Sequence, residues 1–233
     1  MKDFKKIFSI YFKKLWPVAA ILFVVLIFFH PVWLKGKVPI PGDFIVGVYR
    51  PWLDYKWGYE VGVPVKNPLT SDVVSVIFPL RSLAVDYLLK GEAPLWMGNM
   101  FAGYPLLANF QVAIFSPTVI FYFLFSKLDA WSLQVIFQII LSSLFTYLLL
   151  RNLKVEKIGS IFGAISYSFG AFSMIWLEWN THSLTAAWIP LILLSLYKYS
   201  KEGKMKWAGL FSLSVCLQLL SGYPQTAFYT WIL

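Results

Sequence analysis

Long apolar runs separated by short basic stretches are the main pattern of this chain. A membrane-spanning helix needs about 20 mostly apolar residues. Ionisable residues are absent from the middle of each such run, so any chemistry is expected at the helix ends. The pattern predicts an all-α polytopic membrane protein. The predicted spans are residues 10–29, 130–150, 158–177, 184–199 and 207–221.

The composition agrees with a membrane protein. Hydrophobic residues make up 59% of the chain, and charged residues make up 13%, against roughly 25% in soluble domains. The net charge of +9 does not indicate nucleic-acid binding, because the basic residues lie in short runs between apolar segments. The single cysteine, Cys216, excludes an intramolecular disulfide and a cysteine-based zinc site.

The N-terminus is a basic stretch followed by an apolar run, an order that a secretory signal peptide also has. The apolar run continues through Phe28 and Phe29, and no small-x-small cleavage site follows it. We therefore expect an uncleaved first transmembrane helix, with a signal peptide as the alternative. Positive charge is retained on the cytoplasmic side, so a cytoplasmic N-terminus is expected from Lys2, Lys5, Lys6, Lys13 and Lys14.

Residues 112–126 form an apolar segment that determines the side of everything after it. If this segment does not cross the membrane, the basic residues of 151–157 and 198–206 join the N-terminal lysines on the cytoplasmic side. If it crosses, both groups move outside. The positive-inside rule therefore favours an interfacial or re-entrant helix for residues 112–126.

The predicted organisation has three parts. Residues 1–30 contain the cytoplasmic N-terminus and the first transmembrane helix, and residues 31–129 form a large extracytoplasmic loop with short helices. Residues 130–233 contain the later spans. The last run, beginning near Pro224, stops at Leu233 in mid-helix, so we expect the chain to be part of a longer protein.

The outer loop combines an amphipathic run with many aromatic residues. Between Ile77 and Leu88 the apolar positions are near helical spacing. The aromatic residues before this run have two interpretations that stay open: a belt at the membrane surface, or a surface that stacks on a sugar ring or covers a lipid tail. They are Tyr49, Trp52, Tyr55, Trp57 and Tyr59.

Polar side chains suited to catalysis or binding gather on the outer side of this topology. Each also has a structural explanation. Aspartates are common in turns and at helix starts, a histidine can serve as a loop residue, glutamines can bond backbone groups freed by prolines, and arginines can be surface charges or grip a phosphate. The candidates are Asp43, Asp72, Arg50, Arg81, Asn109, Gln111, His182 and Gln225.

Two short patterns concern packing. Gly-Tyr-Pro occurs at residues 103–105 and again at 222–224, each time ahead of Gln-x-Ala. Non-helical backbone at membrane depth persists only where protein or water satisfies it, so we expect these turns to border a polar cavity. A small-residue stripe in 158–177 predicts close packing against a neighbouring helix. Its members are Gly159, Gly163, Ser166 and Gly170.

One long motif carries a family resemblance. The stretch "KGEAPLWMGNMFAGYPLLANFQVAIFSP" resembles the YfhO-type family of bacterial membrane proteins, in which a similar segment follows a large first outer loop. The sequence departs from the family at Met97-Gly98-Asn99, where the family tends to have Asn-Pro. The segments "SDVVSVIFPLR", "THSLTAAWIPL" and "GYPQTAFY" are also similar to family segments, so the resemblance covers most of residues 38–233.

The resemblance implies a GT-C-like transmembrane helix bundle in the bacterial cytoplasmic membrane. Enzymes of that type transfer a sugar from a polyprenyl-phosphate carrier on the outer face, here to an envelope glycopolymer acceptor. Asp43 has the position of their catalytic acidic residue, and Asp72 is the alternate. Because no Asp-x-Asp motif is present, a divalent metal stays open. A transporter or flippase of lipid-linked sugars and a non-catalytic envelope-assembly protein are the alternatives.

The implied transfer needs two kinds of protein group. A base must take the proton of the acceptor hydroxyl, and hydrogen-bond donors must stabilise the leaving phosphate. Asp43 suits the first role. The second role is expected for Arg50, Arg81 or His182, and Asn109 and Gln111 are expected to face polar substrate or free backbone groups.

Overall fold

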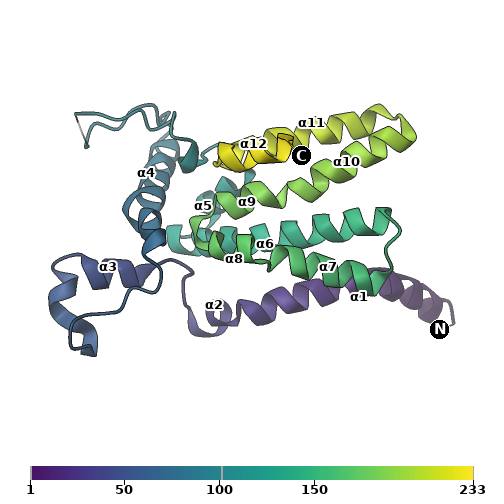
Figure 1. The fold of residues 1–233 in the computed structure, drawn as a ribbon, viewed down its shortest axis with the longest axis horizontal. Coiled ribbons are helices and arrows are strands. Elements are labelled where there is room, and N and C mark those ends of the chain that lie inside the picture. The colour runs from purple at the N-terminus through teal and green to yellow at the C-terminus, as the bar shows by residue number, and fades with distance from the viewer. Residues whose placement is uncertain (1, 101, 233) are drawn as a thin grey trace.

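The computed structural model describes the backbone of residues 2–100 and 102–232 and the side chains of residues 15–100 and 102–232. Within these ranges all regular structure is helical, apart from one antiparallel bridge between Met97 and Tyr104. The predicted all-α class is therefore confirmed. Figure 1 shows a bundle of long helices with an irregular segment at one end.

The bundle consists of helices that run roughly along a common axis (Figure 1). Two helical segments are long and apolar enough to cross a membrane, Lys127–Asn152 and Lys157–Ile175. Apolar helices that are shorter cover Leu15–Phe28 and Met205–Leu220. The bundle helices are α1 (Lys2–Phe28), α6 (Lys127–Asn152), α7 (Lys157–Ser168), α10 (Ile189–Glu202) and α11 (Met205–Leu220). Helix α6 contacts α1, α7 and α10, and α10 also contacts α11.

The helix α1 is built into the bundle by one apolar face. Ile21, Val25 and Phe29 recur every fourth residue and are buried, and α1 contacts both α6 and α7. Side chains at a four-residue spacing share one face of a helix. The predicted first span therefore packs as an integral bundle helix.

The predicted span 184–199 is interrupted near its start. The short helix α9 (His182–Ala187) precedes α10, and Pro190 occupies the first turn of α10. A proline cannot donate to the carbonyl four residues earlier, so the carbonyl of Ala186 lacks its usual helical donor. It accepts the Tyr167 hydroxyl at 3.0 Å and the amide of Trp188 instead. The neighbouring Thr185 carbonyl accepts the Gln218 amide at 3.2 Å. Side chains of α7 and α11 thus satisfy the groups that the break exposes.

The span 158–177 is interrupted at Phe169 and Gly170, between α7 and α8 (Ala171–Ile175). Of its small-residue stripe, Gly163 carries the close packing: a Cβ there would lie 2.5 Å from Cδ1 of Leu150 on α6. This contact agrees with the prediction that the stripe admits a neighbouring helix.

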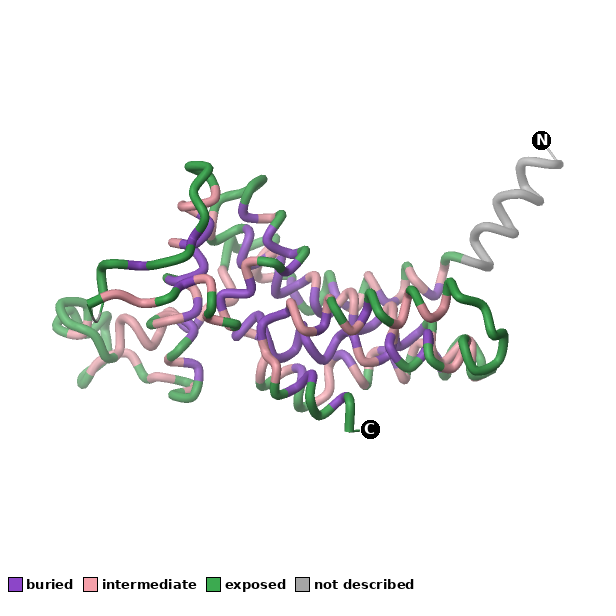
Figure 2. The backbone as a smooth tube through the Cα atoms, turned by 90° about the horizontal axis from the view of Figure 1, so that it is seen from above, coloured by how far each residue is buried: buried purple, intermediate pink, exposed green. Residues whose placement is uncertain are grey.

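Polar residues line the bundle interior and apolar residues cover much of its surface. On α6, Gln134, Gln138 and Ser142 are buried at four-residue spacing, whereas Ile158 and Phe162 of α7 are 74% and 73% exposed. Buried residues run through the middle of the bundle and into its junction with the segment between α1 and α6, residues 29–126 (Figure 2). An outward apolar surface of this extent is typical of contact with lipid or with another apolar partner.

The segment between α1 and α6 folds into short helices at one end of the bundle. Helix α4 (Phe78–Leu89) lies across the bundle axis (Figure 1) and buries Leu80 and Ala84 against Met97, Leu106 and Val112. Ahead of α4 the helices are α2 (His30–Lys35), α3 (Gly42–Val48), η1 (Trp52–Gly58), η2 (Pro68–Thr70) and the π-helical turn η3 (Val73–Ile77). The others are α4 (Phe78–Leu89), η4 (Phe110–Val112), η5 (Pro117–Val119) and α5 (Ile120–Leu124), while η6 (Leu177–Trp179) and α12 (Pro224–Ile232) complete this end.

Residues 112–126 do not form a continuous helix. Their longest helix, α5, has five residues, far fewer than the roughly 20 that a crossing needs. The N-terminus, the α6–α7 loop and the α10–α11 loop all lie at the end of the bundle opposite the short helices (Figure 1). The basic segments therefore share one end of the bundle, and the interfacial placement of residues 112–126 stays a prediction.

Candidate functional site

A cavity of about 550 Å³ lies where the segment between α1 and α6 meets the bundle. Its walls come from the end of α1, the loop ahead of α3, the loop ahead of η3, and the α8–η6 turn. Apolar side chains such as Phe28, Ile40 and Met174 form part of the lining. The polar lining residues are Asp43, Lys66, Asn67, Thr70 and Glu178.

Asp43 is held in this cavity by two backbone hydrogen bonds. Pro41 and Gly42 turn the chain into α3, which puts Asp43 in its first turn. One carboxylate oxygen accepts the amide of Phe44 at 3.1 Å, and the other accepts the amide of Lys66 at 2.9 Å. The carboxylate is thereby fixed in orientation and joins two loops that are distant in sequence.

A close approach between α3 and the following loop supports this geometry. A Cβ on Gly47 would lie 2.5 Å from the carbonyl oxygen of Val63. A side chain at this position would therefore push the loop that carries Lys66 away from α3. Gly47 keeps the two backbones close enough for the Lys66 amide to reach Asp43.

Glu178 brings a second carboxyl to the cavity from the bundle side. It lies in η6, is half-buried, and has no hydrogen-bond or ion-pair partner within the described part of the chain. Burial raises the pKa of Glu178, and the negative charge of Asp43 raises it further, while Lys66 opposes the shift. These effects favour the protonated acid.

In the stretch "LEWNTHSL", residues 177–184, His182 was predicted to belong to the site and Glu178 was not. A usable signal was present, because Glu178 is the single acidic residue on the predicted outer side after residue 130. What the sequence does not reveal is that the α8–η6 turn lies beside the Asp43 loop.

The other predicted carboxylate, Asp72, does not line this cavity. It is exposed, and although it sits at the start of η3 its side chain makes no capping hydrogen bond. Arg50 is likewise outside the cavity: its side chain is exposed and lies 3.7 Å from the carboxylate of Asp54. Neither residue is brought near Asp43 by the contacts described.

Arg81 is fully buried and bonds to the protein itself. Its guanidinium donates to the carbonyls of Val112 (2.9 Å) and Gln111 (3.0 Å) and to Oε1 of Gln134 (2.8 Å). It also lies over the Trp131 ring at 5.3 Å. The guanidinium thus joins α4 and the turn at Gln111 and Val112 to α6. Because its donors are used in these bonds, Arg81 is poorly placed to bind a ligand in the cavity.

The predicted pair Asn109 and Gln111 takes part in this same segment. Asn109 caps η4 by accepting the amide of Gln111 at 2.9 Å, and its amide donates to the Tyr104 hydroxyl at 3.0 Å. Gln111 contributes its carbonyl to Arg81. Both residues are therefore used in shaping the turn, which was one of their two expected roles.

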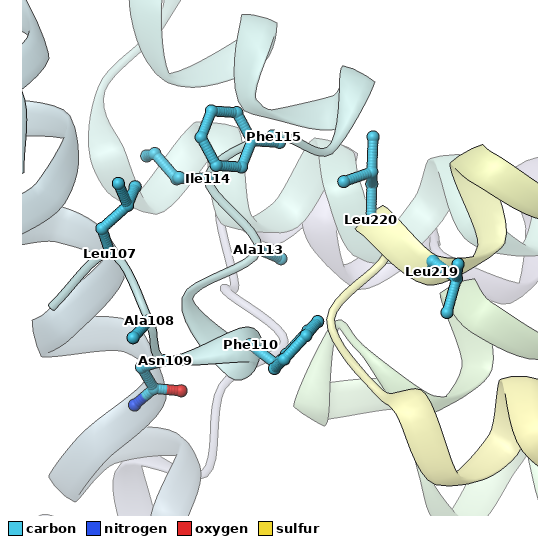
Figure 3. Close-up of a pocket in the computed structure, with 9 residues that line it drawn as sticks. All are labelled: Leu107, Ala108, Asn109, Phe110, Ala113, Ile114, Phe115, Leu219 and Leu220. Carbon is cyan, nitrogen blue, oxygen red and sulfur yellow. The ribbon is translucent and has the colours of Figure 1, made fainter. Parts of the chain in front are cut away.

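A separate apolar pocket of about 220 Å³ borders this segment. Figure 3 shows residues 107–110 and 113–115 on one side and Leu219 and Leu220 of α11 on the other. Asn109 is the one polar residue among the nine that line it. The expected polar cavity at this turn is thus mostly apolar, and the polar cavity lies instead around Asp43.

His182 is buried in an aromatic cluster outside the Asp43 cavity. Its ring stacks on Trp176 with a centroid distance of 4.4 Å, and Trp179 approaches edge-on at 4.8 Å. Burial lowers the pKa of His182 to about 4. The imidazole is therefore neutral at neutral pH and supplies no positive charge for a leaving phosphate.

The second Gly-Tyr-Pro turn, at residues 222–224, packs directly on the turn at Phe110 and Ala113 that follows the first one. A Cβ on Gly222 would lie 2.8 Å from Cβ of Ala113 and 2.9 Å from the carbonyl oxygen of Phe110. Gln225 is exposed and links the hydroxyls of Tyr223 and Tyr229. The two similar motifs are thus neighbours in space.

Among the described residues, no group of three or more histidine, cysteine, aspartate or glutamate side chains comes together in a way that would hold a metal ion. Asp43 and Glu178 are the carboxylates of the cavity. Comparisons of the chain with protein-family models, curated proteins and solved structures find no match.

Proposed function

We propose that this protein is a multi-pass membrane glycosyltransferase of the GT-C type. It transfers a sugar from a polyprenyl-phosphate carrier to a cell-envelope acceptor on the outer face. The observation that carries the proposal is the oriented Asp43 carboxylate in a cavity between the outer segment and the bundle. The resemblance of residues 38–233 to YfhO-type proteins supports the same assignment.

The proposed topology has the N-terminus in the bacterial cytoplasm. Two helices are long and apolar enough to cross a membrane, and the exposed apolar residues of α1, α7 and α11 suit contact with lipid. The basic loops lie at the same end of the bundle as the N-terminus, which supports a cytoplasmic location for that end.

In the proposed reaction Asp43 is the base. Its carboxylate takes the proton of the acceptor hydroxyl while the acceptor oxygen bonds to the anomeric carbon. The bond from that carbon to the phosphate oxygen breaks, and the polyprenyl phosphate leaves with the bonding electrons. Lys66 is the cation of the cavity lining, so we assign it the charge-stabilising role for which Arg50, Arg81 and His182 were considered.

The test uses the full-length protein in a host that lacks it. Envelope sugar content is compared between wild type, Asp43→Asn and the control Asp54→Asn, an exposed aspartate outside the cavity, at equal membrane abundance. We expect sugar addition with wild type and Asp54→Asn, and a loss of about 10²-fold or more with Asp43→Asn. Full activity of Asp43→Asn would exclude Asp43 as the base. If wild type adds no sugar, a transporter or assembly protein becomes the better reading.

A further inference from the structure

We propose that Glu178 is a second functional carboxyl of the cavity, and that as a protonated acid it donates a hydrogen bond to a phosphate oxygen of the bound ligand. The inference rests on the proposed function, because it takes the ligand to be a lipid phosphate. It assigns a role to a residue that the transfer mechanism above does not use.

The first argument is the difference between the hydrogen bonding of the two carboxyls. Both oxygens of Asp43 already accept backbone amides. Glu178 lines the same cavity from the bundle side, and within the described residues its carboxyl has no partner. A half-buried carboxyl without a partner is free to bond to a ligand that enters the cavity.

The second argument is charge. The cavity lining contains two carboxyls and one lysine, so two ionised carboxylates would give it a net negative charge and repel a phosphate. A protonated Glu178 removes that repulsion and supplies a donor, while Asp43 keeps the oxygens that a base needs. The two carboxyls then have complementary roles.

The surroundings of Glu178 favour the protonated form. Asp43 at the start of α3 and Lys66 in the following loop are the charged groups that act on it, and the burial of its side chain is the largest effect. The neighbouring elements α8 (AFSMI) and η3 (VVSVI) contribute no ionisable side chain. On α9 the ionisable residue is His182, which is stacked on Trp176.

The first experiment measures the proton without any ligand. Infrared difference spectra of the purified full-length protein follow the carbonyl band of protonated carboxylic acids as the pH is raised. We expect a band that persists above the ordinary glutamate range, is absent in Glu178→Gln, and is lost at lower pH in Asp43→Asn because a repelling charge is gone. Spectra of wild type and Glu178→Gln that do not differ would overturn the inference and leave the proposed transferase standing.

The second experiment measures binding of citronellyl phosphate, a short isoprenoid monophosphate, by tryptophan fluorescence. Between about pH 5 and about pH 8 we expect wild-type affinity to fall about tenfold more than that of Glu178→Gln, whose neutral amide remains a donor. The matched control Glu92→Gln changes an exposed glutamate outside the cavity and should behave as wild type. Identical pH profiles for wild type and Glu178→Gln would overturn the inference.

The two sources of a phosphate ligand are separated by a parallel titration with inorganic phosphate. Tighter binding of citronellyl phosphate supports a lipid-linked ligand, and equal binding overturns it. If the infrared band behaves as expected but neither wild type nor Glu178→Gln binds citronellyl phosphate, the lipid-phosphate substrate is wrong, and the proposed transferase fails together with the assigned ligand.

Discussion

Replacing Arg81 tests the claim that this arginine holds the turn at Gln111 and Val112 against α6. The variant Arg81→Met keeps most of the side-chain volume and removes all three hydrogen bonds. Oε1 of Gln134 retains a second donor, the Tyr122 hydroxyl at 3.2 Å. Within the described residues the carbonyls of Gln111 and Val112 have no other donor. The variant therefore leaves two carbonyls unpaired, that of Val112 buried and that of Gln111 half-buried.

The expected cost follows from those two carbonyls. Leaving a buried acceptor unpaired costs about 1–3 kcal/mol, so two give about 2–6 kcal/mol. Removing the guanidinium also recovers part of the free energy spent on burying its charge. We therefore expect the free energy of local opening to fall by about 3 kcal/mol, which speeds amide exchange in the segment about 100-fold.

Hydrogen exchange measured by mass spectrometry on the purified protein provides the assay. The amides of Val112, Ala113 and Ser116 report on this segment, because each bonds within it. Arg50→Ala is the control, since the Arg50 side chain is 81% exposed and its loss should change stability by less than about 0.5 kcal/mol. Exchange in Arg81→Met that matches the wild-type rate would refute the structural role of the Arg81 hydrogen bonds and return Arg81 to the ligand-binding candidates.

Two further predictions concern the turn at Gly222 and the α10–α11 loop. Gly222 has φ of +96° and no room for a Cβ, so Gly222→Ala should lower the free energy of unfolding, measured by thermal denaturation, by about 2–4 kcal/mol. Gly209 lies in open space within α11, so Gly209→Ala should instead raise the free energy of unfolding by about 0.5–1 kcal/mol. Equal effects of the two substitutions would contradict the close packing at Gly222. In the loop, hydrogen bonds from Trp207, then Lys204 and Lys198, lower the pKa of Glu202 from 4.5 to about 2. The stabilisation is therefore complete above about pH 4.5 and is lost as the pH falls through about 2. Trp207 fluorescence, taken as wild type minus Trp207→Phe, should change in that window and stay constant in Glu202→Gln.

The parts of the fold that depend on local pattern were predictable from sequence. Apolar runs of sufficient length located α6 and α11 at both ends and α1 at its C-terminal end to within about three residues, because a helix is set by its own side chains and length. The start of α1, at Lys2, lies eight residues before the predicted start of the span at residue 10. The break before α10 was missed: Pro190 gave a local signal, but the donors that make the break tolerable come from Tyr167 and Gln218 on other helices.

The site was predictable only in part for the same reason. Asp43 was a candidate as a polar residue on the predicted outer side, the family resemblance added its catalytic role, and the structure places it in a cavity. Arg81 was expected to bind substrate because a buried and an exposed arginine look alike in sequence. The carbonyls of residues 111 and 112 that hold it are about 30 positions away, and no local pattern indicates that contact.

The close contact between Gly222 and the Phe110–Ala113 turn bears on the order in which the protein is assembled. These groups are separated by more than 100 residues, and α6 to α11 must all be synthesised between them. The Phe110–Ala113 turn therefore completes its packing only after the turn at Gly222, beyond α11, has been synthesised. Until then the apolar side chains of the Phe110–Ala113 turn lack this packing partner, and the incomplete chain is exposed to aggregation, to proteases and to chaperones.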